Sequence, residues 1–174
     1  MTDTRLNDPK FSSLHGNAWD SVWTPEDGGP GVLYVGSSEV DFPGELFDAV
    51  VSVFSWPKMI GLDRETWLPA EGVPHLDMPL YDASAIPVKE IRTCVEFINV
   101  FMQRNETVLV RCQAGLNRSS IVAGAWLIHK AGMYPEEAIE TIRLARGPQA
   151  LFNQSFKLWL MQGAPWDLQG NPWE

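Results

Sequence analysis

Short apolar runs, separated by turn-forming residues, recur through the first two thirds of the chain and predict strands. They are Val32–Ser37, Val50–Phe54, Val73–Met78 and Thr107–Arg111. Apolar runs of about four to eight residues that are bounded by glycine or proline are typical of strands buried in a sheet. We therefore predict one sheet, with Thr107–Arg111 as its central strand.

Other apolar residues recur at helical spacing and predict four helices. The first begins at Pro87, a favoured residue in a first turn. Its inward face is formed by Val88, Ile91, Val95, Ile98 and Met102. The others are predicted over Ser119–Lys130, over Pro135–Arg146 and over about Asn153–Met161. Strands that alternate with helices predict an α/β fold, with a central, mainly parallel sheet flanked by helices.

The same pattern divides the chain of 174 residues into three parts. Residues 31–162 contain the alternating strands and helices, and we predict that they form one domain. Residues 1–30 are polar and rich in turns, but their tryptophans indicate an N-terminal extension that packs on the domain. Residues 163–174 form a C-terminal tail without periodicity. Residues 55–72, with two prolines and two glycines, are expected to be a long connection, with room for a short helix.

Composition narrows the classes of partner. The formal net charge is −9, so the chain repels nucleic acid and anionic lipid surfaces overall, and a nucleic-acid partner is not expected. No apolar stretch approaches the ~20 residues of a membrane span, so no membrane partner is expected. The N-terminus lacks the apolar core of a signal peptide. A cytoplasmic location is the resulting expectation.

Cysteine and histidine usage indicates neither a disulfide framework nor a metal centre. Cys94 falls in a predicted amphipathic helix and is expected to be a buried structural thiol, although a redox partnership with Cys112 stays open. The three histidines, His15, His75 and His129, lack the spacing of metal ligands. We predict no metal ion and no cofactor.

The most informative segment joins the central strand to the next helix. It runs from Cys112 through Gln113, Ala114, Gly115, Leu116, Asn117 and Arg118 to Ser119. A short glycine-containing loop between a buried strand and a helix directs its N–H groups and the helix N-terminus at one point, which favours an anion. The guanidinium of Arg118 adds a planar fork of donors suited to a phosphoryl group.

A cysteine at the start of such a loop has the chemistry of a nucleophile. A free cysteine with a pKa near 8.5 is only about 3% thiolate at neutral pH. Helix N-termini and nearby cations lower that pKa to roughly 3.5–7.5, so that the thiolate dominates. The segment therefore predicts displacement at phosphorus by Cys112, through a cysteinyl-phosphate intermediate.

These residues resemble the Cys-x5-Arg-Ser/Thr loop of the protein tyrosine phosphatases, and the form Cys-Gln-Ala-Gly-x-x-Arg-Ser is closest to the dual-specificity branch. The segments around Val32–Ser37, Phe47–Val53, Leu80–Asp82 and Pro135–Ile139 resemble other parts of the same family. The resemblance covers roughly residues 31–162. It implies a dual-specificity-phosphatase-like fold, and a hydrolase of phosphotyrosine and phosphoserine or phosphothreonine whose partner is a phosphorylated protein or peptide.

The resemblance also implies residue roles. Cys112 would be the nucleophile, Arg118 the phosphate clamp, and Ser119 the hydroxyl that stabilises the leaving thiolate. The backbone N–H groups of Gln113, Ala114, Gly115, Leu116 and Asn117 would complete the phosphate site. Asp82 would act as general acid and then as general base. Asp77 is the rival for that role.

One departure from the family pattern keeps alternatives open. The family usually has histidine immediately before the cysteine, and this chain has Arg111. Arg111 could supply charge to Cys112, or its side chain could point elsewhere and leave the cysteine less activated. A catalytically weak or inactive phosphate-binding module is therefore one alternative. An RNA 5′-triphosphatase-like enzyme is another, because Leu116-Asn117-Arg118-Ser119 resembles a loop of that branch.

Overall fold

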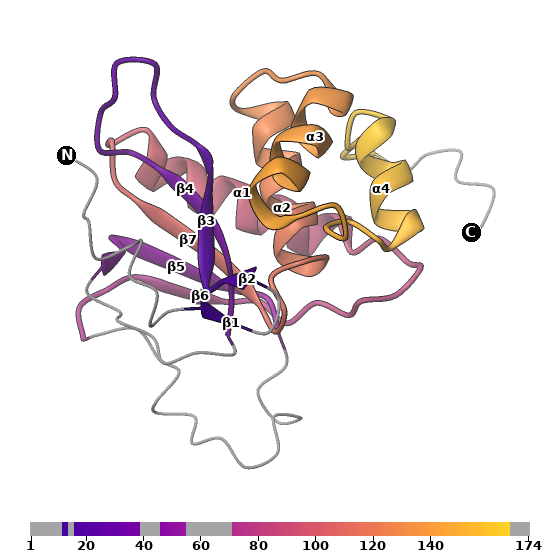
Figure 1. Cartoon of the computed structure of the whole chain (residues 1–174), viewed down its shortest axis with the longest axis horizontal. Helices are drawn as coiled ribbons and strands as arrows, with labels where there is room; N and C mark the ends of the chain where they lie inside the picture. The colour runs from indigo at the N-terminus through magenta and orange to yellow at the C-terminus, as the bar shows by residue number, and fades with distance from the viewer. Residues whose placement is uncertain (1–11, 14–15, 39–45, 55–70, 168–174) are drawn as a thin grey trace, which may run out of the picture.

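The computed structural model describes residues 12–13, 16–38, 46–54 and 71–167, and arranges them as a sheet covered by helices (Figure 1). The strands are β1 (Ser12–Ser13), β2 (Gly16–Asn17), β3 (Trp19–Trp23), β4 (Leu33–Ser37), β5 (Ala49–Ser52), β6 (His75–Asp77) and β7 (Val108–Cys112). The helices are α1 (Val88–Met102), α2 (Arg118–His129), α3 (Pro135–Arg146) and α4 (Gln154–Met161). All four predicted helices are present, and their ends lie within one residue of the prediction.

The main sheet has five strands in the order β3-β4-β7-β5-β6, and β1 and β2 form a separate antiparallel pair. β4, β7, β5 and β6 are all parallel, whereas β3 runs antiparallel to β4 at the edge. The predicted mainly parallel α/β sheet with β7 at its centre is thus confirmed. Most of the predicted connection 55–72 lies outside the described residues.

Strand β3 belongs to the segment for which the sequence predicted only packing on the domain. Its residues pair with β4, and the register shifts between Ser21 and Trp23. Trp19 and Val22 are buried while Ser21 is exposed, so the strand does not alternate strictly between buried and exposed positions. A bulge of this kind breaks the period of two on which strand prediction depends. This part of the extension therefore lies within the sheet itself.

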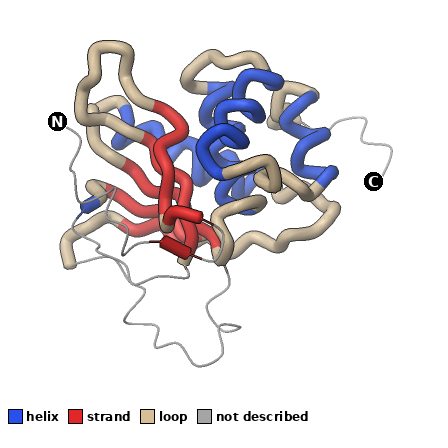
Figure 2. The backbone as a smooth tube through the Cα atoms, in the orientation of Figure 1, coloured by secondary structure: helices blue, strands red, loops and turns tan. Residues whose placement is uncertain are grey.

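The helices pack on one face of the sheet, as Figure 2 shows in blue against red. α1 and α2 contact the parallel strands directly, α3 reaches β3, and α4 packs on α2 and α3. Alternate residues of β4, β5 and β7 bury into this layer, and in β7 these are Val108, Val110 and Cys112. A smaller cluster, which contains Trp19, Tyr34, Phe47, Val50 and Leu109, lies on the other face. No helix of the described part of the chain has both the length and the apolar character needed to cross a bilayer.

The sheet topology places the end of β7 between the ends of its two parallel neighbours. Ser37 of β4 is level with Cys112, and Ser52 of β5 is level with Arg111. In an open parallel sheet, ligands bind in the crevice outside the carboxyl ends of the strands. The loop that follows Cys112 leaves the sheet at this edge and leads into the N-terminus of α2.

Candidate active site

Cys112 lies at the base of the loop between β7 and α2, with its side chain on the helix-covered face of the sheet. Cys112 is 2% exposed. The sulfur lies 3.2 Å from Ser119 Oγ, and it accepts a hydrogen bond of 3.2 Å from the backbone N–H of Gly115. The structure thus brings together the cysteine, the hydroxyl of α2 and the loop that the sequence predicted as one site.

The carbonyl groups of this loop, residues 113–117, are bonded to donors outside it. Ser37 Oγ donates to the carbonyl of Gln113 at 2.7 Å, and the N–H of Leu151 donates to the carbonyl of Leu116 at 2.9 Å. The carbonyl groups are thereby held away from the sulfur. Within the described residues, the N–H groups of Ala114, Leu116 and Asn117 have no protein acceptor. The loop therefore presents a concave set of donors, which we call the cradle.

Arg146, in the last turn of α3, anchors the middle of the cradle. Its Nε donates to the carbonyl of Gly115 at 3.0 Å, and its Nη2 donates to the carbonyl of Ala114 at 3.2 Å. Its Nη1 forms an ion pair of 2.7 Å with Asp20 of β3, and the arginine side chain is completely buried. The sequence analysis named Arg146 only as the last residue of a predicted helix. No local pattern marks a contact between residues that lie 31 and 126 positions apart.

Gly115 is required by the crowding at this point. Its φ is +71°, and a Cβ atom would lie 2.7 Å from the backbone carbonyl of Gly36 and 2.6 Å from Arg146 Nη2. Real Cβ atoms do not approach backbone atoms so closely, and L residues other than glycine rarely adopt this φ. The glycine in the motif is thus explained by the close approach of β4 and α3.

Asp82 comes to the same pocket from the segment between β6 and α1. Its Oδ2 accepts a hydrogen bond of 2.9 Å from Asn117 Nδ2, and its Oδ1 accepts one of 2.7 Å from Asn153 Nδ2. Asp77, the rival in the sequence analysis, is not among the pocket residues. Its charge instead acts on Arg111, as described below.

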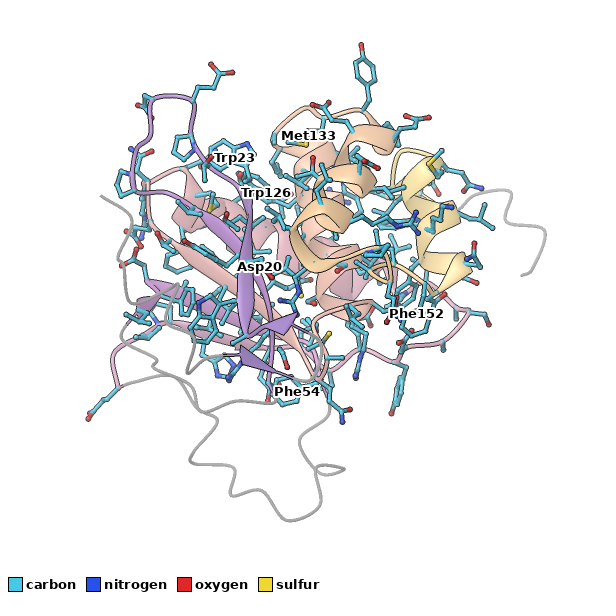
Figure 3. The ribbon with its side chains drawn as sticks, viewed as in Figure 1. Asp20, Trp23, Phe54, Trp126, Met133 and Phe152 are labelled. Atoms are coloured by element: carbon cyan, nitrogen blue, oxygen red, sulfur yellow. The ribbon has the colours of Figure 1, made fainter. Side chains whose placement is uncertain are left out.

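The pocket has a volume of about 260 Å3. It is lined by Asp82, Cys112, Gln113, Ala114, Leu116, Asn117, Arg118 and Phe152. Arg118 Nη1 also reaches the carbonyl of Leu80, at 3.5 Å. Phe152, labelled in Figure 3, is 59% exposed and adds an aromatic side chain to the rim. Neither Phe152 nor Asn153 was predicted, because both lie in the turn before α4 and only the fold brings Phe152 to the pocket and Asn153 to Asp82.

Arg111 points away from the cradle. In β7 it follows the opposite alternation to Cys112, and it is 0% exposed. Its Nε donates to Ser52 Oγ at 2.9 Å, and its guanidinium lies 5.5 Å from the centre of the Phe54 ring. Burial lowers the pKa of Arg111 well below its ordinary value, to about 9, against the opposing effect of the negative Asp77. Of the two possibilities for this residue, the structure has the side chain directed elsewhere.

Cys94, His75 and His129 lie apart from this chemistry. Cys94 is buried in α1, and burial, followed by the charge of Glu90, raises its pKa from 9.0 to about 12. Both cysteines are free thiols. His75 bonds to Ser52 and His129 to the carbonyl of Ala164, while His15 falls outside the described residues. Among the described residues, no three His, Cys, Asp or Glu side chains are grouped so that they could hold a metal ion.

Known proteins resemble this chain in sequence. The family model described as dual specificity phosphatase, catalytic domain, matches residues 47–164. Dual specificity protein phosphatase 12 of Mus musculus is 29% identical over 133 residues, which cover 74% of this chain and 38% of that protein. The tyrosine-protein phosphatase cdcA of Emericella nidulans is 32% identical over 114 residues, which cover 61% of this chain and 19% of that protein. The chain thus spans well under half the length of these curated relatives.

The fold has solved counterparts. The crystal structure of human DUSP28 superposes with a TM-score of 0.68 at 20% identity, over 87% of this chain and 95% of that one. A mouse putative dual specificity phosphatase, complexed with zinc tungstate, gives a TM-score of 0.66 at 22% identity. These likenesses concern the fold. The family model spans the cradle and every helix of the structure, and the chain therefore belongs to the family of dual specificity phosphatase catalytic domains.

Proposed function

We propose that this protein is a cysteine-dependent protein phosphatase, which hydrolyses phosphotyrosine and phosphoserine or phosphothreonine. The observation that carries the proposal is the position of Cys112 Sγ, at the floor of a cradle of backbone donors, with Asp82 in the wall of the same pocket. The substrate is a phosphorylated protein or peptide, in keeping with the names of the relatives.

In the first step the Cys112 thiolate attacks the phosphorus atom, so that an S–P bond forms as the bond to the leaving oxygen breaks. The cradle N–H groups and the Arg118 guanidinium bind the three other phosphoryl oxygens, whose charge is spread over them in the transition state. Asp82 gives its proton to the leaving oxygen, and the dephosphorylated side chain departs as an alcohol or phenol.

In the second step water attacks the cysteinyl phosphate. The Asp82 carboxylate, now deprotonated, takes a proton from the water as the O–P bond forms and the S–P bond breaks. Ser119 Oγ, 3.2 Å from the sulfur, can donate a hydrogen bond to the departing thiolate. Inorganic phosphate leaves, and Asp82 is protonated again for the next cycle.

Hydrolysis of para-nitrophenyl phosphate tests the proposal, measured between about pH 5 and 8 with a chelator present. The comparison is between the wild type, Cys112→Ser and Asp82→Ala. We expect turnover by the wild type, a loss of at least about 10³-fold in Cys112→Ser, and a smaller loss in Asp82→Ala. Turnover that survives in Cys112→Ser would overturn the cysteine mechanism.

The two alternatives give different results in the same preparation. A phosphate-binding module would bind vanadate or a phosphopeptide but would release no product from any substrate. An RNA 5′-triphosphatase-like enzyme would release phosphate from triphosphate-ended RNA and not from a phosphotyrosine peptide. Arg111 motivated the binding-module hypothesis, and its placement on the far face leaves that alternative to be tested. The close contact of Cys112 and Ser119 supports turnover.

A further inference from the structure

We propose that the side chains of Asn117 and Asn153 are positioning residues, which hold Asp82 in the orientation needed for proton transfer. The inference rests on the proposed function. It gives a role to the side chain of Asn117, for which the family motif implies only a backbone N–H contact, and to Asn153, which lies outside the motif. Asp82 lies in an exposed segment, residues 81–85, where an unrestrained carboxyl group would sample several rotamers.

The three residues are joined in a closed ring of two side-chain hydrogen bonds and one backbone hydrogen bond. Asn117 Nδ2 donates to Asp82 Oδ2 at 2.9 Å, and Asn153 Nδ2 donates to Asp82 Oδ1 at 2.7 Å. The ring closes where the backbone N–H of Asn153 donates to Asn117 Oδ1 at 3.1 Å. Asn153 Nδ2 also donates to the carbonyl of Ala83 at 2.9 Å, which fixes the backbone beside the acid.

Backbone N–H donors fix the orientation of the side-chain amide groups of Asn117 and Asn153, that is, which end is the oxygen and which the nitrogen. A backbone N–H faces one end of the Asn117 amide, so that end must be the oxygen and the end facing Asp82 must be the nitrogen. The oxygen of Asn153 accepts from the N–H groups of Ser155 and Phe156, at 3.1 and 3.3 Å, as the N-cap of α4. Its nitrogen is therefore directed at Asp82 as well.

This arrangement holds the carboxyl group without blocking its chemistry. A carboxylate has about four lone-pair sites on its two oxygens, and the two amides occupy one on each oxygen. A proton can therefore still reside on Asp82 and pass to the leaving oxygen. Because Asn117 belongs to the cradle and is 3% exposed, the acid is also tied directly to the loop that binds the phosphoryl group.

The test uses the dependence of kcat on the leaving group. Phenyl phosphate releases a phenol with a pKa of about 10, as tyrosine does, and needs the acid. para-Nitrophenyl phosphate releases a stabilised phenolate and needs it much less. In Asn117→Ala and Asn153→Ser we expect kcat to fall about 10-fold or more with phenyl phosphate, and by less than about 3-fold with the nitrophenyl substrate.

The variants are chosen to separate positioning from folding. Asn117 makes no side-chain cap to α2, so its replacement by alanine removes no cap. Serine at position 153 retains an oxygen that can cap α4 but lacks the amide nitrogen that reaches Asp82. Asn99→Ala removes the same side chain from α1 and is the matched control. Each variant is also made in an Asp82→Ala background, where a positioning residue has nothing left to position.

The outcomes are distinct. A selective loss with phenyl phosphate that disappears in the Asp82→Ala background establishes the positioning role. Equal losses with both substrates, or an undiminished loss in that background, would overturn the role while wild-type turnover leaves the proposed function standing. If Asn117→Ala does not fold, Asn153→Ser alone tests the role by the same two criteria. A wild type without turnover would overturn both proposals.

Discussion

Two adjacent residues of β7 lie in different environments, on opposite faces of the sheet. Cys112 faces the helix layer and lies at the base of the cradle, whereas Arg111 is completely buried on the other face of the sheet. The cysteine has backbone donors and the N-terminus of α2 around it. The arginine has Ser52 and the ring of Phe54. Strand alternation alone separates them, because successive side chains point to opposite faces.

The difference shows that a charge next to a nucleophile in sequence need not act on it. Positive potential at the cradle comes from its backbone N–H groups, the N-terminus of α2 and Arg118, while Arg111 carries its charge into the opposite layer. We therefore expect substitutions on the cradle side to change turnover, and substitutions of Arg111 to change mainly stability. Three predictions on turnover, in order of decreasing effect, and one on stability test this contrast.

Replacing Arg146 with methionine should have the largest effect. The carbonyl groups of Ala114 and Gly115 would lose their donor, and Asp20 would lose its buried ion-pair partner. Breaking a buried pair by removing one partner destabilises a protein by about 3–5 kcal/mol. We also expect kcat/KM to fall about 100-fold, because the cradle loses its shape. Urea denaturation and steady-state kinetics measure the two effects.

The conservative variant sharpens this test. Arg146→Lys keeps a positive charge near Asp20 but lacks the planar fork that reaches both carbonyl groups, so it should recover more stability than activity. Arg104→Met, on the exposed surface at the end of α1, is the matched control and should change neither. Full activity in Arg146→Met would show that the cradle keeps its shape without this anchor.

Phe152 should have a moderate effect on substrate preference. Its exposed ring at the pocket rim can stack on an aromatic substrate, and ring pairs contribute about 0.5–1.5 kcal/mol. In Phe152→Ala we expect KM to rise by about 2- to 10-fold for a phosphotyrosine peptide, and to change little for the matched phosphoserine peptide. The reverse order, or equal changes, would remove Phe152 as a determinant of specificity.

Arg111 should have the smallest effect on turnover. Arg111→Met removes a side chain directed away from Cys112, so we expect kcat with para-nitrophenyl phosphate to stay within about 3-fold of the wild type. A loss as large as that of Arg146→Met would contradict the contrast on which these predictions depend. Arg111→His, which restores the residue usual in the family, serves as the comparison in the same assay.

The buried Arg111 should change how the free energy of unfolding depends on pH. Burial lowers its pKa to about 9, so above this pH the folded protein releases a proton that the unfolded chain keeps to a much higher pH. The unfolded state then binds more protons, and the free energy of unfolding rises with pH through this term. Relative to Arg111→Met, the wild type should gain about 1 kcal/mol per pH unit above about pH 9, measured by urea denaturation.

A second buried group titrates in the same range with the opposite sign. The raised pKa of Cys94, about 12 instead of 9.0, means that the folded state keeps a proton that the unfolded chain loses, so stability falls with rising pH. This effect is present in both proteins and cancels in the difference between them. A flat difference between the wild type and Arg111→Met would show that Arg111 keeps its ordinary pKa despite burial.

Several parts of the fold were predictable because their signals are local. The apolar runs of β4, β5 and β7 and the helical spacing of α1 predicted the mainly parallel α/β sheet. Proline and glycine bounded α3 closely. β3 was missed because its bulge removes the alternation and because pairing with β4 is a tertiary event. Likewise the contact of Cys112 with Ser119 follows from a motif of eight residues. Arg146 contacts the loop carbonyl groups from a distant helix, and Phe152 and Asn153 reach the pocket lining and Asp82 from a distant turn.

Residue order along the chain was enough to predict the parallel strands and the four helices, the position of Cys112 with its following loop, and the arginine and serine at the start of α2, because each depends on residues close together in the chain. The contacts of the long polar side chains depended on the tertiary structure instead. It directed Arg111 away from the sulfur, brought Arg146 to the back of the cradle, and closed Asn117, Asn153 and Asp82 into a ring. A side chain's partners are set by the packing of distant segments, and residue spacing carries no information about that packing.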